Sequence, residues 1–392
     1  MVGASVLSLP RMVANNGWVL GPTMVVFAGA VSFRACILVD RALEAMAIAH
    51  GQHPRNIGDV VQECFGQVGR RAVLILTGIF QISKCGVYFV VIGTNLNYIA
   101  GWVSQRVWAV TGAVLCMRLI FVRDITVISR WSIIGVLASV CYLFTITAGG
   151  FEAATHPGEH GTARWPETYS DILADFAVMV YAYSPADVLP VMKHDMKEPE
   201  QLRWALKISF LAVISIYVGL GSVAFLGWGE DVAGNILLSM CERPGCPGNV
   251  AESETPGQKW ILGYLLACAV VSNLMVTAPV VLYCVFRVLE AEHSHLLSNS
   301  IINGSVRVVA VMGALLLALF MPYFTEILAV ISTGLLTILQ VFVPVAVTFG
   351  LSRQGIVAFG AAEAMLGLLG LCMFTVGMSS ALRNLYEALT SS

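Results

Sequence analysis

The sequence predicts an all-α protein that crosses a membrane about eleven times. Hydrophobic residues make up 57% of the 392 residues and charged residues only 12%, and the mean hydropathy is +0.80. A soluble domain usually carries about 25% charged residues. The apolar residues form continuous runs suited to membrane helices of about 20 residues, not the alternating strands of a membrane barrel. These features exclude a soluble enzyme, a disordered chain and a basic nucleic-acid-binding protein.

Eleven apolar runs are expected to form the spans. They are 2–16, 19–40, 72–100, 107–122, 131–149, 170–190, 205–228, 260–286, 306–322, 325–350 and 355–379. Pro and Gly inside several runs are tolerated in lipid, because neighbouring helices satisfy the freed backbone groups. All eight Trp lie near the ends of runs or in connections, as in the aromatic belts of membrane proteins.

The connections between runs predict the orientation of the chain. One set of connections holds fourteen Lys and Arg residues and the opposite set holds five. Because basic residues are enriched in cytoplasmic loops, the first set is expected on the cytoplasmic side, and the chain would begin inside and end outside. Within that set, residues 50–71 carry apolar residues at helical spacing and are expected to form an amphipathic helix at the interface. The pattern fits a plasma membrane or a vacuolar or lysosomal membrane equally.

Two cysteines differ from the other eight. Cys241 and Cys246 lie in a polar loop, 229–259, that the orientation places outside the cytoplasm. A disulfide between them is expected if that side is oxidising, and two free thiols are the alternative. The cysteines and histidines show no zinc-binding spacing. We expect no cofactor and no metal site.

Two runs combine small polar residues with proline and are expected to be interrupted helices. Residues 3–12 read GASVLSLPRM, and residues 181–193 read YAYSPADVLPVMK. They lie five spans apart, which is the spacing of an inverted repeat with discontinuous helices at matching places. We expect one transporter domain, 1–392, with a first repeat over 1–149, a second over 170–350 and an extra helix at 355–379. Proline-kinked packing helices are the alternative.

The expected breaks predict a binding site. A half-helix that begins inside the membrane presents free N–H groups that suit a carboxylate, and unwound carbonyls suit an ammonium group. A zwitterionic amino acid matches both. The residues expected to line this site are Gly3, Ala4, Ser5, Val6, Tyr88, Tyr181, Ala182, Tyr183 and Ser184. Packing of small residues between helices is the alternative role for the first four.

Charged side chains inside spans are functional candidates because they are costly in lipid. Lys84 lies in the middle of its run, where a buried amine loses its proton readily. Asp187 lies in the sixth span. Both are candidates for ion coupling, and a structural pair of Lys84 with Asp187 or Glu363 is the alternative. Arg11 is expected to pair with Asp187 or to bind an acidic substrate.

Two long motifs resemble the amino acid/auxin permease family of the LeuT-like amino acid-polyamine-organocation superfamily. The first is GASVLSLPRMVANNGWVLGP, and the second is LPVMKHDMKEPEQLRWALKIS. NIGDVVQECFGQVGRR and YFVVIGTNL also fit. The resemblance implies a LeuT-like fold of eleven helices and alternating-access transport of amino acids, usually coupled to H⁺ and sometimes to Na⁺. It further implies that span 8 supplies oxygens opposite the break of span 1, from Ser272, Asn273 and Thr277.

The sequence thus predicts a secondary active amino acid transporter, coupled to H⁺ or alternatively to Na⁺, and not an enzyme. Its expected partners are a small amino acid and the lipid bilayer, without nucleic acid. The family commonly has a neutral residue at Arg11, so a non-transporting amino acid sensor or scaffold, or an inactive truncated permease, is the alternative. Residues 1–9 would extend only about 14 Å as a helix. We therefore expect a segment of the first span to precede Met1.

Overall fold

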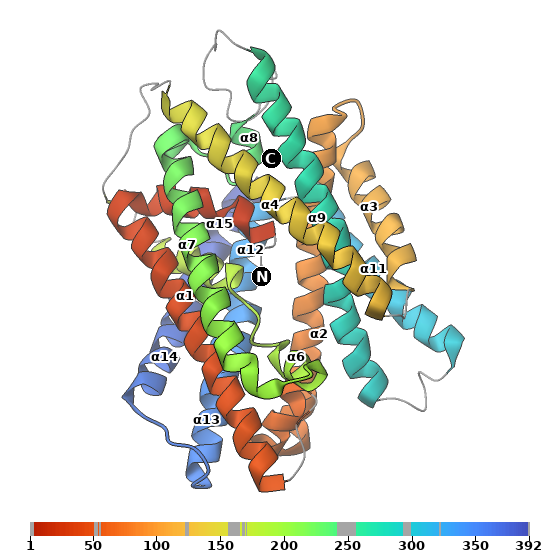
Figure 1. The fold of residues 1–392 in the computed structure, drawn as a ribbon, viewed down its shortest axis with the longest axis vertical. Helices are drawn as coiled ribbons and strands as arrows, with labels where there is room; N and C mark the ends of the chain where they lie inside the picture. Colours follow the sequence, from red (N-terminus) through yellow and green to blue (C-terminus); the bar gives the residue numbers. More distant parts are fainter. Residues whose placement is uncertain are drawn as a thin grey trace.

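A computed structural model gives the structure, and it describes residues 4–50, 54, 56–121, 125–155, 165–166, 169, 171–240, 256–292, 299–320 and 323–390. These residues form helices and connections, with no strand among them (Figure 1). The helices are η1 (Ala4–Leu7), α1 (Leu9–His50), α2 (Ile57–Ile99), α3 (Gln105–Ile120), α4 (Ile125–Thr155), α5 (Ile172–Ala182), α6 (Leu189–Asp195), η2 (Pro199–Gln201), α7 (Leu202–Trp228), η3 (Gly229–Asp231), α8 (Ile236–Ser239), α9 (Pro256–Glu292), α11 (Ser300–Phe320), α12 (Phe324–Ile331), η4 (Ser332–Phe342), α13 (Val343–Arg353), α14 (Ala361–Cys372), η5 (Met373–Gly377) and α15 (Met378–Thr390).

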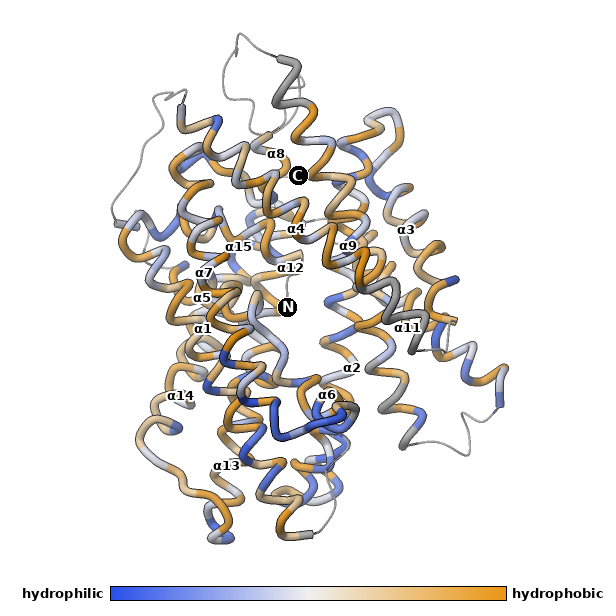
Figure 2. The backbone as a smooth tube through the Cα atoms, viewed as in Figure 1, coloured by the Kyte–Doolittle hydropathy of each residue, from blue (hydrophilic) through white to orange (hydrophobic). Residues whose placement is uncertain are grey.

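The long helices identify a multi-pass membrane protein. Eight helices in the described ranges are long and apolar enough to cross a membrane, by length and composition. The two shorter runs, 107–122 and 170–190, correspond to α3 and to α5 with the connection after it. Figure 2 shows hydrophobic residues along most of the long helices and hydrophilic residues gathered around α6. The all-helical membrane fold is therefore confirmed.

Glycines join short helical segments to long ones at two places where the sequence predicted separate elements. α1 contains both of the first two predicted spans, and they meet at Gly17, whose backbone angles are φ 76° and ψ 173°. α2 begins with the predicted interface helix, which meets the third span at Gly66 with φ 67° and ψ −168°. This region of backbone space is open almost only to glycine. Each glycine therefore lets the chain change direction without a loop.

Replacing Gly17 with alanine should lower the free energy of unfolding by about 1–3 kcal/mol, because a Cβ makes this backbone conformation strained. Gly78→Ala is the matched control, since it lies in α2 with no atom within 4 Å of an added Cβ. Thermal melting followed by size-exclusion chromatography in detergent measures both variants. Equal melting temperatures for the two would contradict the role assigned to Gly17.

Helix packing brings the two expected breaks together. α1 packs against α7 and α5, α4 packs against α9 and α7, and α2 packs against α9, α3 and α11. η1 contacts both α5 and α2. The short first helical segment therefore contacts the two helices that carry Tyr88 and Tyr181. The division into two repeats stays a prediction.

Candidate functional site

The sixth span is broken, as the sequence predicted. α5 ends at Ala182 and α6 begins at Leu189, and residues 183–188 connect them. The connection is a series of turns in which the N–H groups of Tyr183 and Ser184 donate to the carbonyls of Val180, at 3.0 Å, and Tyr181, at 3.2 Å. Proline at 185 removes a backbone donor. The helix therefore stops inside the bundle and restarts six residues later.

The first span is also irregular where the sequence predicted. Ala4, Ser5 and Val6 lie in the 3-10 helix η1, all buried, and Gly3 lies outside the described residues. The carbonyl of Ser5 accepts both the backbone N–H of Ser8, at 3.2 Å, and its hydroxyl, at 2.9 Å. α1 begins one residue later, with Pro10 in its first turn. Both breaks therefore occur in small or polar residues next to a proline.

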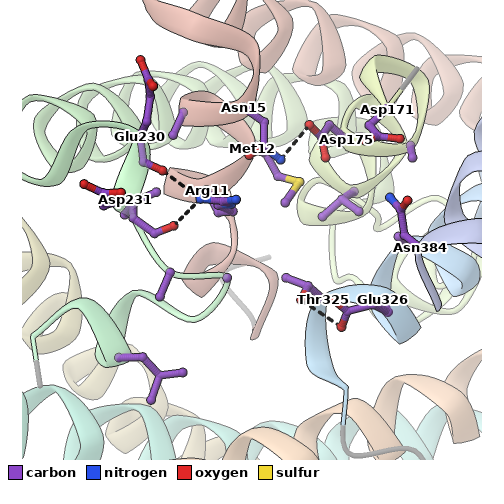
Figure 3. Close-up of a pocket in the computed structure, with 18 of the residues that line it drawn as sticks. Arg11, Met12, Asn15, Asp171, Asp175, Glu230, Asp231, Thr325, Glu326 and Asn384 are labelled. Atoms are coloured by element: carbon purple, nitrogen blue, oxygen red, sulfur yellow. Dashed lines mark hydrogen bonds between the residues drawn. The ribbon is translucent and has the colours of Figure 1, made fainter. Parts of the chain in front are cut away.

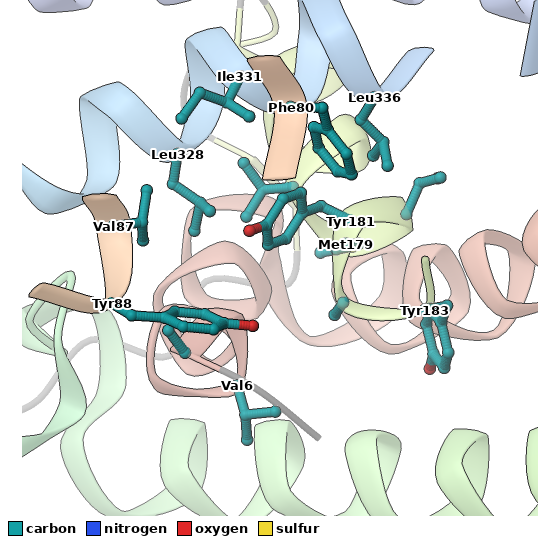
Figure 4. Close-up of a cluster of buried hydrophobic side chains, with 14 of the residues drawn as sticks. Val6, Phe80, Val87, Tyr88, Met179, Tyr181, Tyr183, Leu328, Ile331 and Leu336 are labelled. Atoms are coloured by element: carbon teal, nitrogen blue, oxygen red, sulfur yellow. The ribbon is translucent and has the colours of Figure 1, made fainter. Parts of the chain in front are cut away.

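Side chains from four elements converge beside the two breaks. Figure 4 shows Val6 from η1, Tyr88 from α2 and Tyr181 from α5 around one centre, with Leu328 of α12 above them. Val6 is fully buried, and Tyr88 and Tyr181 are each 4% exposed. The structure thus brings together three of the predicted substrate-binding residues. Apolar and aromatic surfaces dominate this centre.

Other predicted residues lie at its edge. Tyr183 points away from Tyr88 and Tyr181 in Figure 4 and packs against α7, with its ring centroid 5.0 Å from that of Tyr217. The hydroxyl of Tyr217 donates to the carbonyl of Ala182 at 3.4 Å. Ser184 is half-buried. Tyr183 and Ala182 therefore connect the break to α7. Of the residues predicted to line one site, Tyr181 faces Tyr88 and Tyr183 faces α7.

A cluster of buried polar side chains lies on the other side of the second break. It includes residues that the sequence analysis did not single out. The Nε2 of Gln81 donates to Oδ2 of Asp187 at 2.7 Å. The backbone N–H of Ala186 donates to Oε1 of Gln340 at 3.3 Å. Gln340 belongs to η4, a π-helical stretch of a kind that is frequent at functional sites. Glutamines in apolar runs were the available signal for both, because buried polar side chains need partners.

Lys84 belongs to the same group. Its Nζ lies 4.9 Å from the ring centroid of Phe80 and 5.5 Å from that of Tyr181. Its charge also acts on Asp187. The two predicted ion-coupling residues therefore lie in the same region, because Asp187 is bonded to Gln81, one turn before Lys84 on α2. Both the coupling role and the structural alternative stay predictions. Glu363, the other predicted partner, pairs with Arg34 instead.

Several buried polar atoms around the second break have no hydrogen-bond partner among the residues that the structure describes. They are the hydroxyls of Tyr181 and Tyr183, Oε1 of Gln81, Oδ1 of Asp187 and Nε2 of Gln340. A buried polar atom without a partner costs about 1–3 kcal/mol. The break thus offers both donors and acceptors to a polar ligand.

A cavity of about 750 Å³ opens beyond the breaks on the side predicted to be extracytoplasmic (Figure 3). It is lined by the first turns of α1 and α5, by η3 and the residues after it, and by parts of α12 and α15. We call it the outer cavity. Arg11 reaches η3, where its Nη1 donates to the carbonyls of Glu230 at 2.8 Å and Val232 at 3.0 Å. The prediction that Arg11 pairs with Asp187 is therefore wrong, because backbone carbonyls of a distant loop take its hydrogen bonds.

The oxygens predicted on span 8 lie on α9. The hydroxyl of Ser272 donates to the carbonyl of Cys268 within α9, and Ser272 is exposed. Nδ2 of Asn273 donates to Ser139 of α4 at 2.6 Å, and Thr277 donates to Asn273 at 2.8 Å. These bonds stay within α9 or join it to α4. That these oxygens face the first break stays a prediction. Cys241 and Cys246 lie outside the described residues.

Two interrupted helices that meet at a buried aromatic centre, with polar side chains beside one break and an open cavity beyond, are typical of a secondary-transporter fold. Among solved structures, the chain is similar to a Na⁺-coupled sialic acid symporter in a substrate-bound outward-open state. The TM-score is 0.56 at 12% identity, over 96% of this chain and 86% of that chain. It is also similar to Mhp1, a nucleobase-cation-symport-1 family transporter, with a TM-score of 0.54 at 16% identity over 99% and 89% of the two chains. At these identities the likeness shows the fold.

The family model described as transmembrane amino acid transporter protein matches residues 1–389, and the chain belongs to this family. Similar proteins in Arabidopsis thaliana include the amino acid transporter AVT1E, 22% identical over 88% of this chain and 63% of that protein. AVT1D is 24% identical over 61% and 44%. The vesicular inhibitory amino acid transporter of Xenopus tropicalis is 22% identical over 58% and 45%. The chain therefore spans less than two thirds of the length of these relatives.

Proposed function

We propose that the protein is a secondary active transporter of amino acids, coupled to H⁺, that works by alternating access. The observation that carries the proposal is the meeting of two helix breaks at a buried centre, beside which several polar atoms have no hydrogen-bond partner in the described part of the chain. Membership of the transmembrane amino acid transporter family supports an amino acid as the substrate. Relatives named as amino acid transporters support it as well.

The chemistry of the centre fits a zwitterion. The substrate carboxylate would meet N–H groups of the first break, near Ser5 and Val6, where a half-helix begins. The substrate ammonium group would meet acceptors of the second break, among them Oδ1 of Asp187. Tyr88 and Tyr181 would cover an apolar side chain. A neutral amino acid with an apolar side chain satisfies all three surfaces.

Coupling to H⁺ is favoured over Na⁺ by the arrangement of side chains. Sodium needs several oxygen ligands around one point, whereas Ser272 is exposed and Asn273 is hydrogen-bonded to Ser139 of α4. Lys84 and Asp187, by contrast, are ionisable groups beside the break, and each can take up or release a proton. They remain the proposed coupling residues at the centre.

Uptake of labelled neutral amino acids into proteoliposomes, with H⁺ and Na⁺ gradients varied independently, tests the proposal. We expect uptake that follows the pH gradient and that Lys84→Ala and Asp187→Asn each reduce to background. Lys207→Ala, at an exposed position of α7, is the matched control and should behave as the wild type.

Other results would contradict the proposal. Absence of uptake by well-folded protein across a broad panel of amino acids would exclude transport. Binding without uptake would favour the alternative, an amino acid sensor or scaffold. Uptake that follows only the Na⁺ gradient would contradict coupling to H⁺.

A further inference from the structure

Asp175 is a carboxyl group that the proposed transport site does not use, and it lies on the wall of the outer cavity. It belongs to the first turn of α5, two turns before the break, and is only 7% exposed. It also lines the cavity of about 750 Å³ (Figure 3). A buried carboxyl with access to an open cavity can exchange a proton with the solution on that side.

Two amide groups of the neighbouring helix hold this carboxyl. Nδ2 of Asn16 donates to Oδ2 of Asp175 at 2.8 Å, and Nδ2 of Asn15 donates to the same oxygen at 3.2 Å. Figure 3 shows Asn15 pointing from α1 toward Asp175 on α5. The contact therefore ties together the two helix segments that adjoin the first and second breaks.

The orientation of the amides favours a proton over a metal ion as the ligand. Nδ2 of Asn16 also donates to the carbonyl of Met12 at 2.8 Å. If Oδ1 of Asn16 occupied this position, it would face two acceptors, the carbonyl of Met12 and the carboxylate of Asp175. The NH₂ group of Asn16 must therefore occupy it. The carboxylate thus meets donors from Asn16, whereas Na⁺ or another hard cation needs surrounding oxygens. A proton needs only the carboxylate itself.

The charges around Asp175 are mostly negative. Its own segment adds Asp171, η3 adds Glu230 and Asp231, and α12 adds Glu326. Arg11 of α1 lines the same cavity, and Arg383 of α15 is paired with Asp171 at 3.4 Å. The other elements packed against α5, namely η1, η4 and η5, contain no acidic or basic residue. Neighbouring carboxylates disfavour a further negative charge and so favour protonation.

We propose that Asp175 binds the proton that enters from the outer cavity. Its protonation then controls the hydrogen bonds that join α5 to Asn15 and Asn16 of α1. This rests on the proposed transport function and adds a site to the centre that holds Lys84 and Asp187. The ionised carboxylate accepts two charge-assisted hydrogen bonds from α1, and these bonds weaken when it becomes neutral. A proton taken from water in the outer cavity therefore loosens α1 from α5. Its release restores the tie.

Asp175→Asn in proteoliposomes tests this directly, because asparagine keeps the size of the side chain and cannot ionise. Two assays are compared: exchange of labelled amino acid without a gradient, and accumulation driven by a pH gradient. We expect exchange at the wild-type level and accumulation no higher than without a gradient. Glu200→Gln, the same type of change at an exposed position of η2, is the control and should keep both activities.

A second variant covers the case in which Asp175→Asn does not fold. Asn15→Ala removes the longer hydrogen bond from an exposed side chain and leaves Asn16 in place. Because the ionised carboxylate loses a donor, the pH of half-maximal uptake should move upward. An unchanged or lower value would overturn the proposal.

The remaining outcomes separate this proposal from the proposed function. Accumulation by Asp175→Asn that still follows the pH gradient overturns the role of Asp175. So does loss of exchange in the folded variant, which would place Asp175 in substrate binding. Failure of the wild-type protein to exchange or accumulate any amino acid overturns the proposed function itself.

Discussion

Asp40→Ala should lower the free energy of unfolding by about 3–5 kcal/mol, the range found when one partner of a buried ion pair is removed. Asp40 is fully buried in α1, where Oδ1 accepts from Lys193 at 2.5 Å and Oδ2 from Arg203 at 2.6 Å. Lys193 of α6 is itself only 5% exposed. Without Asp40, its remaining ion pair is with Glu44 at 3.5 Å. The buried ammonium group thus loses its close, buried partner, which accounts for the loss.

Melting temperatures of detergent-solubilised protein, read by size-exclusion chromatography, measure this effect. Glu44→Ala is the matched control, because the Glu44 side chain is 39% exposed and contacts the same two bases, Lys193 and Arg203. It should cost much less, as exposed ion pairs contribute about 0–1 kcal/mol. The double variant Asp40→Ala with Lys193→Met should recover part of the stability. A double variant that melts below the single one would contradict this explanation.

Gly227→Val should destabilise the protein by about 3 kcal/mol or more, at the upper end of the cost of overpacking. A Cβ at Gly227 of α7 would lie 2.5 Å from the carbonyl oxygen of Gly150 in α4 and 3.0 Å from its Cα. Backbone atoms cannot move aside as a side chain can. The two helices would have to separate along a contact where small residues allow close approach.

Gly219→Val is the control for this variant. It lies two turns earlier in α7, and no atom lies within 4 Å of its added Cβ. The same melting assay compares the two valine variants, which share a helix and a side chain. If Gly219→Val were as damaging as Gly227→Val, the loss would come from valine in the helix and not from the α4 contact.

The breaks could be predicted from the sequence because their cause is local. Pro185 removes a backbone donor between the two helices, Pro190 suits the first turn of the helix that restarts, and small polar residues accompany both prolines. The meeting of Val6, Tyr88 and Tyr181 followed from the repeat and the family motifs. Family membership was predicted from the same motifs, and the family model confirms it.

The partners of individual polar residues could not be predicted, because they depend on long-range packing. Arg11 contacts η3, more than 200 positions away in the chain. Gln81 and Gln340 lie in apolar runs whose sequence does not say which side faces the break. Gly17 was interpreted as part of a connection between two spans, since periodicity cannot distinguish a loop from a single residue with positive φ. The π-helical stretch η4 has no sequence signature of its own.

The uninterrupted segment of α1 after Gly17 also fixes how the molecule fits the thickness of a bilayer. Trp18, 40% exposed, begins this segment, and Asp40 lies 22 positions later, about 33 Å along a helix at 1.5 Å per residue. The hydrocarbon core is about 30 Å thick. The indole and the ion-paired carboxylate therefore lie at opposite interfaces, and the network of Asp40, Lys193 and Arg203 lies at the level of the lipid headgroups. The remaining turns, to His50, project beyond the hydrocarbon as a rigid rod of about 15 Å.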